Sequence, residues 1–444
     1  MKFPHPLALL AGCILAAAAA SYVLPAGRYE RRDDARTGRP IVVAGTYHRV
    51  PPAPVTPFQA VVSVPKGMAD AAAVIFLVFL VGGAFTVVDR TGALRHAVDW
   101  LVRRLQDRET LVIPVAAVFF ATGGALENMA EEILAMVPVL LLLARRLGLD
   151  TLTVVAMSTG AAAVGAAFSP INPFAVQIAQ RVSDLPLLSG GLYRTVFLVL
   201  AVAVWIWGTM RYASRTRVAP EQAGVVAGTA PGARKTVVLL VVLATFAGFV
   251  YGVLRLGWDF DQMSALFFVM GVAVGALGGL GVTGTADAFV EGFASMAYPA
   301  MLIGFARAIY VVMDQGQIVD TIVNALFSPL SHLPVALSAF GMMVVQTALH
   351  VPVPSNSGQA VLTMPVLVPL SDLLGLSRQV TVLTYQYGAV LCELLTPTNA
   401  ALMAMLAAAG VRYDKWLRFA VPLYLALFAL GMGAVGLGIA IGLR

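Results

Sequence analysis

Charged residues are scarce in this sequence. Asp, Glu, Lys and Arg make up 12% of its 444 residues, roughly half the share of an ordinary soluble domain. Cysteine is almost absent: Cys13 and Cys392 both lie in apolar segments, which excludes a disulfide framework. The sequence has no P-loop, Gly-x-Ser-x-Gly or His-Glu-x-x-His motif. We therefore expect neither an ATP-driven pump nor an enzyme.

Apolar residues, by contrast, are abundant. They make up 59% of the chain, and the mean hydropathy is +0.85, as in integral membrane proteins. The net charge of +6 comes mainly from short loops between apolar runs, a pattern that sets topology in a bilayer and does not indicate nucleic-acid binding. The composition predicts an all-α polytopic membrane protein that has the lipid bilayer as a partner.

About nine segments are long enough to cross a bilayer as helices, which takes about 20 residues each. Seven are continuous: 7–25, 71–89, 192–211, 236–254, 263–281, 297–313 and 419–442. Two broken helices, 152–180 and 380–409, are interrupted by prolines and polar residues. Two further regions, 111–147 and 335–376, are too long for one span and have a small or polar break in the middle. We interpret these two as re-entrant hairpins.

The two halves of the chain resemble each other. At an offset of 227 residues, 131–172 and 358–399 share 11 identities in 42 positions, and the breaks in the two broken helices coincide. Duplication of this kind is typical of secondary transporters. We divide the chain into a first repeat, a linking span with a cytoplasmic loop, a second repeat and a last span, with the bounds 1–190, 191–235, 236–410 and 411–444.

Basic residues predict the sidedness. If the hairpins are re-entrant, the cytoplasmic side has 16 Lys and Arg, against five in the short loops outside. The N-terminus is then cytoplasmic, the C-terminus lies outside, and the repeats are inverted. The polar stretch 26–69 becomes an exported loop and 282–296 a cytoplasmic one. The helices 93–107 and 317–329 become arms that lie in the membrane interface.

Polar breaks at mid-membrane depth supply candidate binding residues, because non-helical backbone there must line a cavity or be buried in protein. The candidates are Ser169, Asn172, Ser355, Asn356, Ser357, Thr396, Thr398 and Asn399. Their oxygens suit Na⁺ or a polar substrate, and the adjacent helix N-termini suit a carboxylate. The alternatives are an ordinary turn at 355–357 and kinked helices that the asparagines only cap.

Ionisable residues within the membrane are functional candidates by default. The first hairpin tip contains Glu127, Asn128, Glu131 and Glu132, and we favour Glu131 or Glu132 over Glu127. The alternatives are a tip that reaches water and a glutamate that caps the following helix.

Arg307 is the only charged residue in its predicted span, so it requires an acidic partner or a bound anion. Glu393 is either that partner or a protonatable coupling site. Gln359 lines the second hairpin together with Gln346 and His350.

Four stretches point to a family: Gly124-Ala-Leu-Glu-Asn-Met-Ala-Glu-Glu132, Asn172-Pro-Phe174, Ser357-Gly-Gln-Ala360 and Thr396-Pro-Thr398. They resemble the YfcC-like branch of the anaerobic C4-dicarboxylate carrier family, in the ion transporter superfamily. The resemblance implies an inverted-repeat fold, a homodimer, elevator-like alternating access, and dicarboxylate or amino acid substrates.

In that superfamily, Ser-Asn-Thr tips bind Na⁺ and the substrate carboxylate. The second tip matches as Ser355-Asn356-Ser357, whereas the first reads Leu126-Glu127-Asn128-Met129.

The sequence therefore predicts a secondary active transporter of carboxylate-bearing solutes in the bacterial inner membrane, coupled to Na⁺ or H⁺ or to exchange. One alternative is an arginine/ornithine-type exchanger of basic amino acids, which the glutamates of the first tip would suit. Another is a channel or a membrane scaffold. No cofactor is expected other than Na⁺ as a coupling ion, for which the breaks at Asn172 and Asn399 are the candidate sites.

Overall fold

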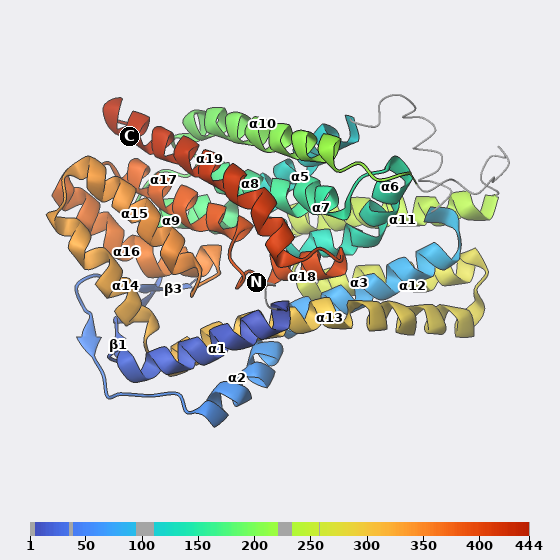
Figure 1. Cartoon of the computed structure of the whole chain (residues 1–444), viewed down its shortest axis with the longest axis horizontal. Coiled ribbons are helices and arrows are strands. Elements are labelled where there is room, and N and C mark those ends of the chain that lie inside the picture. Colours follow the sequence, from blue (N-terminus) through green and yellow to red (C-terminus); the bar gives the residue numbers. More distant parts are fainter. Residues whose placement is uncertain (1–4, 35–38, 95–110, 221–232, 257, 444) are drawn as a thin grey trace.

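The computed structural model describes residues 5–34, 39–94, 111–220, 233–256 and 258–443. It is mostly helical (Figure 1). Eight helical segments of these residues are long and apolar enough to cross a membrane: Pro6–Val23, Ala72–Arg90, Thr151–Val182, Gly191–Arg215, Phe260–Gly278, Gly281–Gln315, Asn356–Leu374 and Tyr413–Ala440. The chain is a multi-pass membrane protein. The expected number of nine spans, the orientation of the termini and the domain bounds stay predictions.

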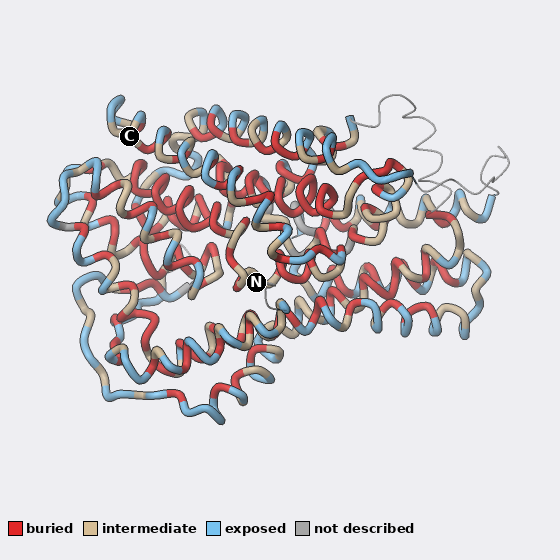
Figure 2. Tube along the Cα trace, viewed as in Figure 1, coloured by how far each residue is buried: buried red, intermediate tan, exposed pale blue. Residues whose placement is uncertain are grey.

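Two apolar cores lie within the described residues. One is formed by α3 (Ala72–Arg90), α11 (Ala233–Leu256), α12 (Phe260–Gly278) and the start of α13 (Gly281–Gln315). The other, larger core contains most of the remaining buried residues. Burial is densest in the middle of the molecule (Figure 2). The end of α13 belongs to the larger core, so this helix contributes to both cores.

Helix α13 corrects a sequence prediction. The expected loop 282–296 and the expected span 297–313 are one continuous helix. Its Asp287 and Glu291 are exposed, whereas the neighbouring Ala288, Phe289 and Gly292 are buried. The acidic residues that indicated a loop therefore lie on the exposed side of this part of α13.

The predicted exported loop 26–69 is also folded. Its strands form two antiparallel pairs, β1 (Gly27–Arg28) with β4 (His48–Arg49) and β2 (Arg31–Asp34) with β3 (Arg39–Val42). It ends in helix α2 (Pro57–Asp70), which begins at a capping box formed by Thr56 and Gln59.

The folded segment 26–69 is called the cap below. The buried carboxylate of Asp320 attaches the cap to helix α14 (Val319–Phe327), which is the second predicted arm. Asp320 accepts hydrogen bonds from the Tyr29 backbone N–H at 2.9 Å and from Arg31 Nη2 at 2.8 Å. Burial, together with the Asp320 charge, raises the pKa of Tyr29 to about 12. The first predicted arm, 93–107, lies outside the described residues beyond Leu94.

The predicted hairpin regions are two helix pairs: α5 (Val112–Glu127) with α6 (Val137–Leu147), and α15 (Val335–His350) with α16 (Asn356–Leu374). Helix α5 packs on α8 (Ala161–Phe168), and α15 packs on α17 (Arg378–Ala389). The pairs therefore make corresponding contacts in the two halves. Their re-entrant course and the inverted repeat stay predictions.

Both predicted broken helices are interrupted. The first consists of α7 (Thr151–Val155), a π-helical turn Ala156–Gly160, α8, a second π-helical turn Pro173–Gln177 and α9 (Ile178–Val182). The second consists of α17, a 3₁₀ turn Val390–Leu394 and α18 (Ala400–Ala408). Helix α10 (Gly191–Arg215) packs on α8, and α19 (Tyr413–Ala440) packs on α17.

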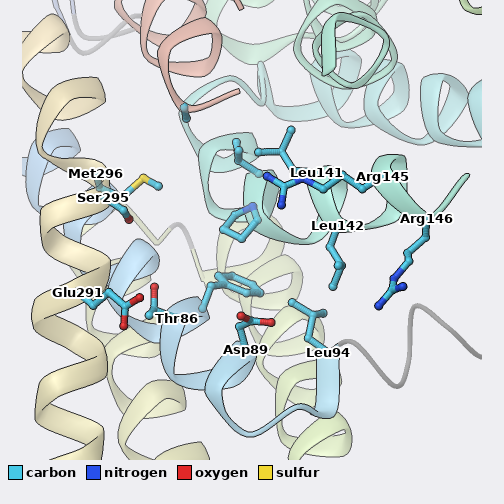
Figure 3. Close-up of a pocket in the computed structure, with 14 residues that line it drawn as sticks. Thr86, Asp89, Leu94, Leu141, Leu142, Arg145, Arg146, Glu291, Ser295 and Met296 are labelled. Atoms are coloured by element: carbon cyan, nitrogen blue, oxygen red, sulfur yellow. The ribbon is translucent and has the colours of Figure 1, made fainter. Parts of the chain in front are cut away.

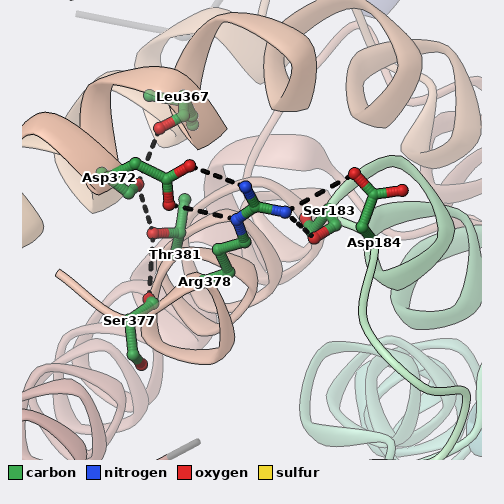
Figure 4. Close-up of polar contacts among 8 residues, drawn as sticks. Ser183, Asp184, Leu367, Asp372, Ser377, Arg378 and Thr381 are labelled. Carbon is green, nitrogen blue, oxygen red and sulfur yellow. Dashed lines mark hydrogen bonds and ion pairs between the residues drawn. The ribbon is translucent and has the colours of Figure 1, made fainter.

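Two ion-pair clusters connect the halves near helix ends. Figure 4 shows the Arg378 guanidinium between Asp372, at 2.7 Å, and the Ser183 carbonyl, at 3.0 Å. Asp150 accepts hydrogen bonds from Lys415 at 2.8 Å and Tyr212 at 2.7 Å. Burial alone would raise the pKa of Asp150, but these hydrogen bonds outweigh it and lower that pKa below its ordinary value.

We expect Gly165→Ala to destabilise the protein strongly. Helices α5 and α8 approach so closely that a Cβ on Gly165 would lie 1.9 Å from the Ala121 carbonyl oxygen. Because the obstacle is backbone, the helices must separate, at a cost of about 3 kcal/mol. A thermal melt in detergent measures this loss. The control is Gly433→Ala, which meets nothing within 4 Å in α19. Equal melting temperatures for the two variants would contradict the close packing.

Candidate functional site

Asn128 brings the two predicted hairpin tips together. It ends α5 in the left-handed conformation, with φ 56°. Its Oδ1 accepts a hydrogen bond from Asn356 Nδ2 at 2.9 Å and a longer one from Asn172 Nδ2 at 3.5 Å. Asn356 is the first residue of α16, and its backbone carbonyl accepts a hydrogen bond from the Tyr385 hydroxyl at 2.6 Å. Residues far apart in sequence therefore meet at one junction.

Ser169 and Asn172 attach the first break to α5. Ser169 Oγ donates to the Ala125 carbonyl at 2.7 Å, and Asn172 Nδ2 donates to the Gly124 carbonyl at 2.9 Å. Asn172 Oδ1 also caps the following turn by accepting from the backbone N–H groups of Phe174 and Ala175. Both side chains are fully buried. This is the capping arrangement that the sequence left open as an alternative to binding.

The second break makes similar contacts. Thr398 Oγ1 donates to the Val351 carbonyl at 2.6 Å, just after α15, and exchanges a 2.7 Å hydrogen bond with Thr396. Asn399 caps α18 by accepting from the Leu402 N–H at 3.1 Å. In both halves, a hydroxyl of the break therefore binds the end of the neighbouring hairpin helix.

A small central cavity lies between these elements. It has a volume of about 10 Å³, which is near the minimum for one water molecule or ion. It is lined by Asn128, Met129, Ala130, Thr159, Gly160, Ala162, Ala163, Ala166, Glu393, Leu394, Asn399, Ala401 and Leu402. Glu393 is the single ionisable side chain among these described lining residues.

Thr159 was missed by sequence reasoning. It lies in the π-helical turn Ala156–Gly160, and its buried hydroxyl has no hydrogen-bond partner among the described residues. π-helical turns are frequent at functional sites. The Ala156 carbonyl in this turn accepts a hydrogen bond from Trp205 Nε1 at 2.8 Å. A threonine in an apolar run carries no sequence signal for such a turn.

The other candidates lie around this centre. Ser355 caps α16 by accepting from the Gly358 N–H, and Ser357 is buried in its first turn. Gln359 is buried between α15 and α16, where it binds His350 at 2.8 Å and the Gln346 carbonyl at 2.8 Å. These last three residues therefore hold the hairpin together.

The glutamates of the first tip are less completely described. Glu132 accepts a hydrogen bond from the Ala130 N–H at 3.0 Å, which is a local capping contact. The side chains of Glu127 and Glu131 lie outside the described part of the structure. The preference for Glu131 or Glu132 over Glu127 stays a prediction.

The proposed pairing of Arg307 with Glu393 is wrong. Arg307 pairs with Asp70, at the end of α2, and its guanidinium lies over the Tyr310 ring. Its side chain is 41% exposed. Asp70 directly follows the predicted exported loop 26–69, so the sequence could not indicate this partner.

Arg307 also lines an outer cavity of about 280 Å³. This α13–α16 cavity is bounded by Arg31, Pro40, Val42, Arg307, Tyr310, Asp314, Val319, Val353, Pro354, Ser355, Gly358, Val361 and Leu362. Two arginines, Asp314 and the N-terminus of α16 thus line one space. Such a set can attract a carboxylate.

Arg307→Ala is expected to lower the free energy of unfolding by only about 1 kcal/mol or less, because exposed ion pairs contribute little. Asp70→Ala should have a similar effect. Thermal melts of both variants and of Arg307→Ala combined with Glu393→Ala measure this. If Arg307→Ala is strongly destabilised and the double variant melts like the wild type, Arg307 does pair with Glu393, contrary to our assignment.

A third cavity, of about 390 Å³, separates α6 from α3 and α13. Figure 3 shows Arg145 reaching into it from α6, with Asp89 on α3 and Glu291 on α13 across the space. The sequence counterpart of Asp89 is Asp314, at an offset of 225 residues, and Asp314 lines the α13–α16 cavity. The two larger polar cavities thus involve corresponding aspartates.

No group of three or more His, Cys, Asp or Glu side chains in the described residues could hold a metal ion. The structure does contain an oxygen without a partner at the junction, because Asn356 Oδ1 is buried and accepts no hydrogen bond there.

The sequence matches the family model described as "C4-dicarboxylate anaerobic carrier" over residues 3–440. The chain belongs to this carrier family. Its members are carriers, so the chain is a membrane transport protein, and the family resemblance seen in the sequence motifs is confirmed.

The relatives of this carrier are bacterial. It is 34% identical to an Escherichia coli (strain K12) protein named "Putative basic amino acid antiporter YfcC", over 84% of this chain and 78% of that protein. It is 29% identical to an uncharacterized Haemophilus influenzae protein, over 88% of this chain and 80% of that protein.

Two solved structures align with nearly the whole carrier. The Alcanivorax borkumensis YdaH transporter aligns over 99% of both chains, with 15% identity and a TM-score of 0.44. Neisseria gonorrhoeae MtrF aligns over 98% of this chain and 95% of that one, with 14% identity and a TM-score of 0.41.

Proposed function

We propose that this carrier exchanges amino acids with cationic side chains across the bacterial inner membrane. The observation that carries the proposal is Glu393 in the central cavity. Its neighbours there are the amides of Asn128 and Asn399 and the hydroxyl of Thr159. A carboxylate beside such neutral polar groups suits an ammonium or guanidinium group. The same carboxylate would repel a dicarboxylate.

The carboxylate end of an amino acid has a separate place in this proposal. The first turn of α16, at Ser355–Gly358, offers backbone N–H groups and the positive end of a helix dipole. It faces the α13–α16 cavity, which also contains Arg307. The two ends of a zwitterion would therefore interact with different elements.

The size of the central cavity implies motion. Its volume of about 10 Å³ admits one small group, whereas the flanking cavities are far larger, at about 280 and 390 Å³. We propose that the hairpins and broken helices move as a unit against α3 and α13, opening the centre to each cavity in turn. This is elevator-like alternating access between two populated states.

Two further points support the proposal. The relative at 34% identity is named as a basic amino acid antiporter. In addition, Asn356 Oδ1 and Thr159 Oγ1 are buried oxygens without partners in the described residues. They would help to hold Na⁺ if the exchanger also uses a coupling ion, and H⁺ coupling would instead use Glu393.

A C4-dicarboxylate is the second candidate substrate. The family description names it, and the two arginines of the α13–α16 cavity favour it. Both arginines already have carboxylate partners, Asp320 and Asp70. We therefore place the dicarboxylate second.

A thermal-shift titration of the purified protein tests the choice. We expect arginine, ornithine and lysine to raise the melting temperature, and succinate and fumarate to leave it unchanged. Repeating the series with and without Na⁺ measures ion coupling. Stabilisation by succinate alone would reverse the order of the two candidates.

A further inference from the structure

Arg194, near the start of α10, is fully buried. Its guanidinium donates to three neutral oxygens: the Ser189 carbonyl at 2.7 Å, Gln379 Oε1 at 3.0 Å and Gln386 Oε1 at 3.1 Å. None of these described partners is a carboxylate. An arginine stays charged in a protein, and burying a charge without a counter-charge is costly. Stability alone does not account for this arrangement.

The amide of Gln386 continues the network to the first break. Its Nε2 donates to the Ser169 carbonyl oxygen at 2.7 Å. In an unbroken helix the N–H of residue 173 would donate to that oxygen, but residue 173 is proline and has no N–H. Gln386, on α17 of the second half, therefore supplies the donor that Pro173 lacks.

Arg194 determines which way this amide points. Arginine offers only donors, so the oxygen of Gln386 must face Arg194 and its NH₂ group must face Ser169. A flipped amide would set donor against donor at Arg194 and acceptor against acceptor at Ser169. The buried guanidinium thus excludes the wrong orientation at both ends.

We propose that Arg194 is a positioning residue: it orients Gln386 so that the second half holds the Ser169–Asn172 break of the first half in its binding conformation. The effect on substrate rests on the proposed function, whereas the effect on the break does not. Asn172, in the same break, hydrogen-bonds to Asn128 of the central cavity. A loosened break would therefore displace a residue that lines that cavity.

Two glutamate substitutions separate this role from a purely structural one. Gln386→Glu keeps an oxygen toward Arg194 and adds a counter-charge, but it removes the donor to Ser169. Gln379→Glu adds the same charge to the same guanidinium, and the Gln379 amide donates to Ser189 and not to the break. Both variants should melt at or above the wild-type temperature.

Hydrogen–deuterium exchange of the peptide 169–182 is the first readout. We expect Gln386→Glu to speed its exchange about tenfold, because a buried carbonyl loses its partner, and Gln379→Glu to leave it unchanged. The KM for arginine should rise about tenfold in Gln386→Glu only. If Gln386→Glu does not fold, Arg194→Lys, which lacks the planar fork that holds both glutamines, should give the same faster exchange.

Equal exchange in the two glutamate variants, or normal exchange in Arg194→Lys, would overturn the proposal. The exchange readout does not depend on the substrate. If the wild-type protein does not bind arginine, the proposed function fails, while the exchange difference still tests the role of Arg194.

Discussion

Glu393→Gln is expected to abolish exchange of cationic amino acids while leaving the protein folded. Glutamine matches the shape and most of the hydrogen-bonding capacity of glutamate, so the central cavity should keep its structure. It lacks the charge that binds an ammonium or guanidinium group. The loss of one desolvated charge pair corresponds to about 2–5 kcal/mol, so we expect kcat/KM for arginine to fall at least about 30-fold.

The matched control for Glu393→Gln is Glu30→Gln, which removes an exposed carboxylate in the cap. It should transport like the wild type. Radiolabelled uptake into proteoliposomes and a thermal melt of each variant provide the data. If Glu393→Gln transports arginine with a KM within about threefold of the wild type, Glu393 does not bind the substrate's cationic group.

Asn128→Ala is expected to eliminate transport and also to destabilise the protein. Alanine removes the acceptor that Asn356 and Asn172 share. The Asn356 amide then loses its acceptor, at about 1–3 kcal/mol, whereas Asn172 keeps its hydrogen bond to the Gly124 carbonyl. Alanine also places a Cβ without a polar group at φ 56°, at a cost of about 1–2 kcal/mol. A thermal melt and an uptake assay measure the two effects.

Asn128→Gly separates the contributions at this position. Glycine adopts a positive φ without strain, so Asn128→Gly should recover part of the stability that Asn128→Ala loses. It still lacks the amide, so transport should stay lost. Wild-type transport by Asn128→Gly would mean that Asn128 provides only a backbone turn and that the contact between the tips is dispensable.

The sequence indicated the elements of the centre because they combine proline with polar residues at matching positions of the two halves. The breaks do contain Ser169 with Asn172 and Thr398 with Asn399. Because proline has no N–H, backbone carbonyls near these breaks lack their helical donors, and side chains must supply the hydrogen bonds. What these side chains bind could not be predicted, because capping and ligand binding require the same residue types.

Three features could not be predicted. The π-helical turn at Thr159 accepts a hydrogen bond from Trp205 of another helix. Arg194 looks like an ordinary basic residue near the end of a span, and its burial follows from α17 packed beside it. Arg307 pairs with Asp70, which lies 237 positions earlier in the sequence, at the end of α2. Each depends on tertiary contacts that local sequence does not encode.

Counterflow in proteoliposomes tests the central claim most directly. Vesicles are loaded with unlabelled arginine, ornithine or succinate, and the entry of labelled arginine is followed. We predict rapid entry into vesicles loaded with arginine or ornithine, and background entry into vesicles loaded with succinate or left empty. Labelled succinate that exchanges with internal succinate, while arginine does not enter under any loading, would contradict a cationic amino acid exchanger.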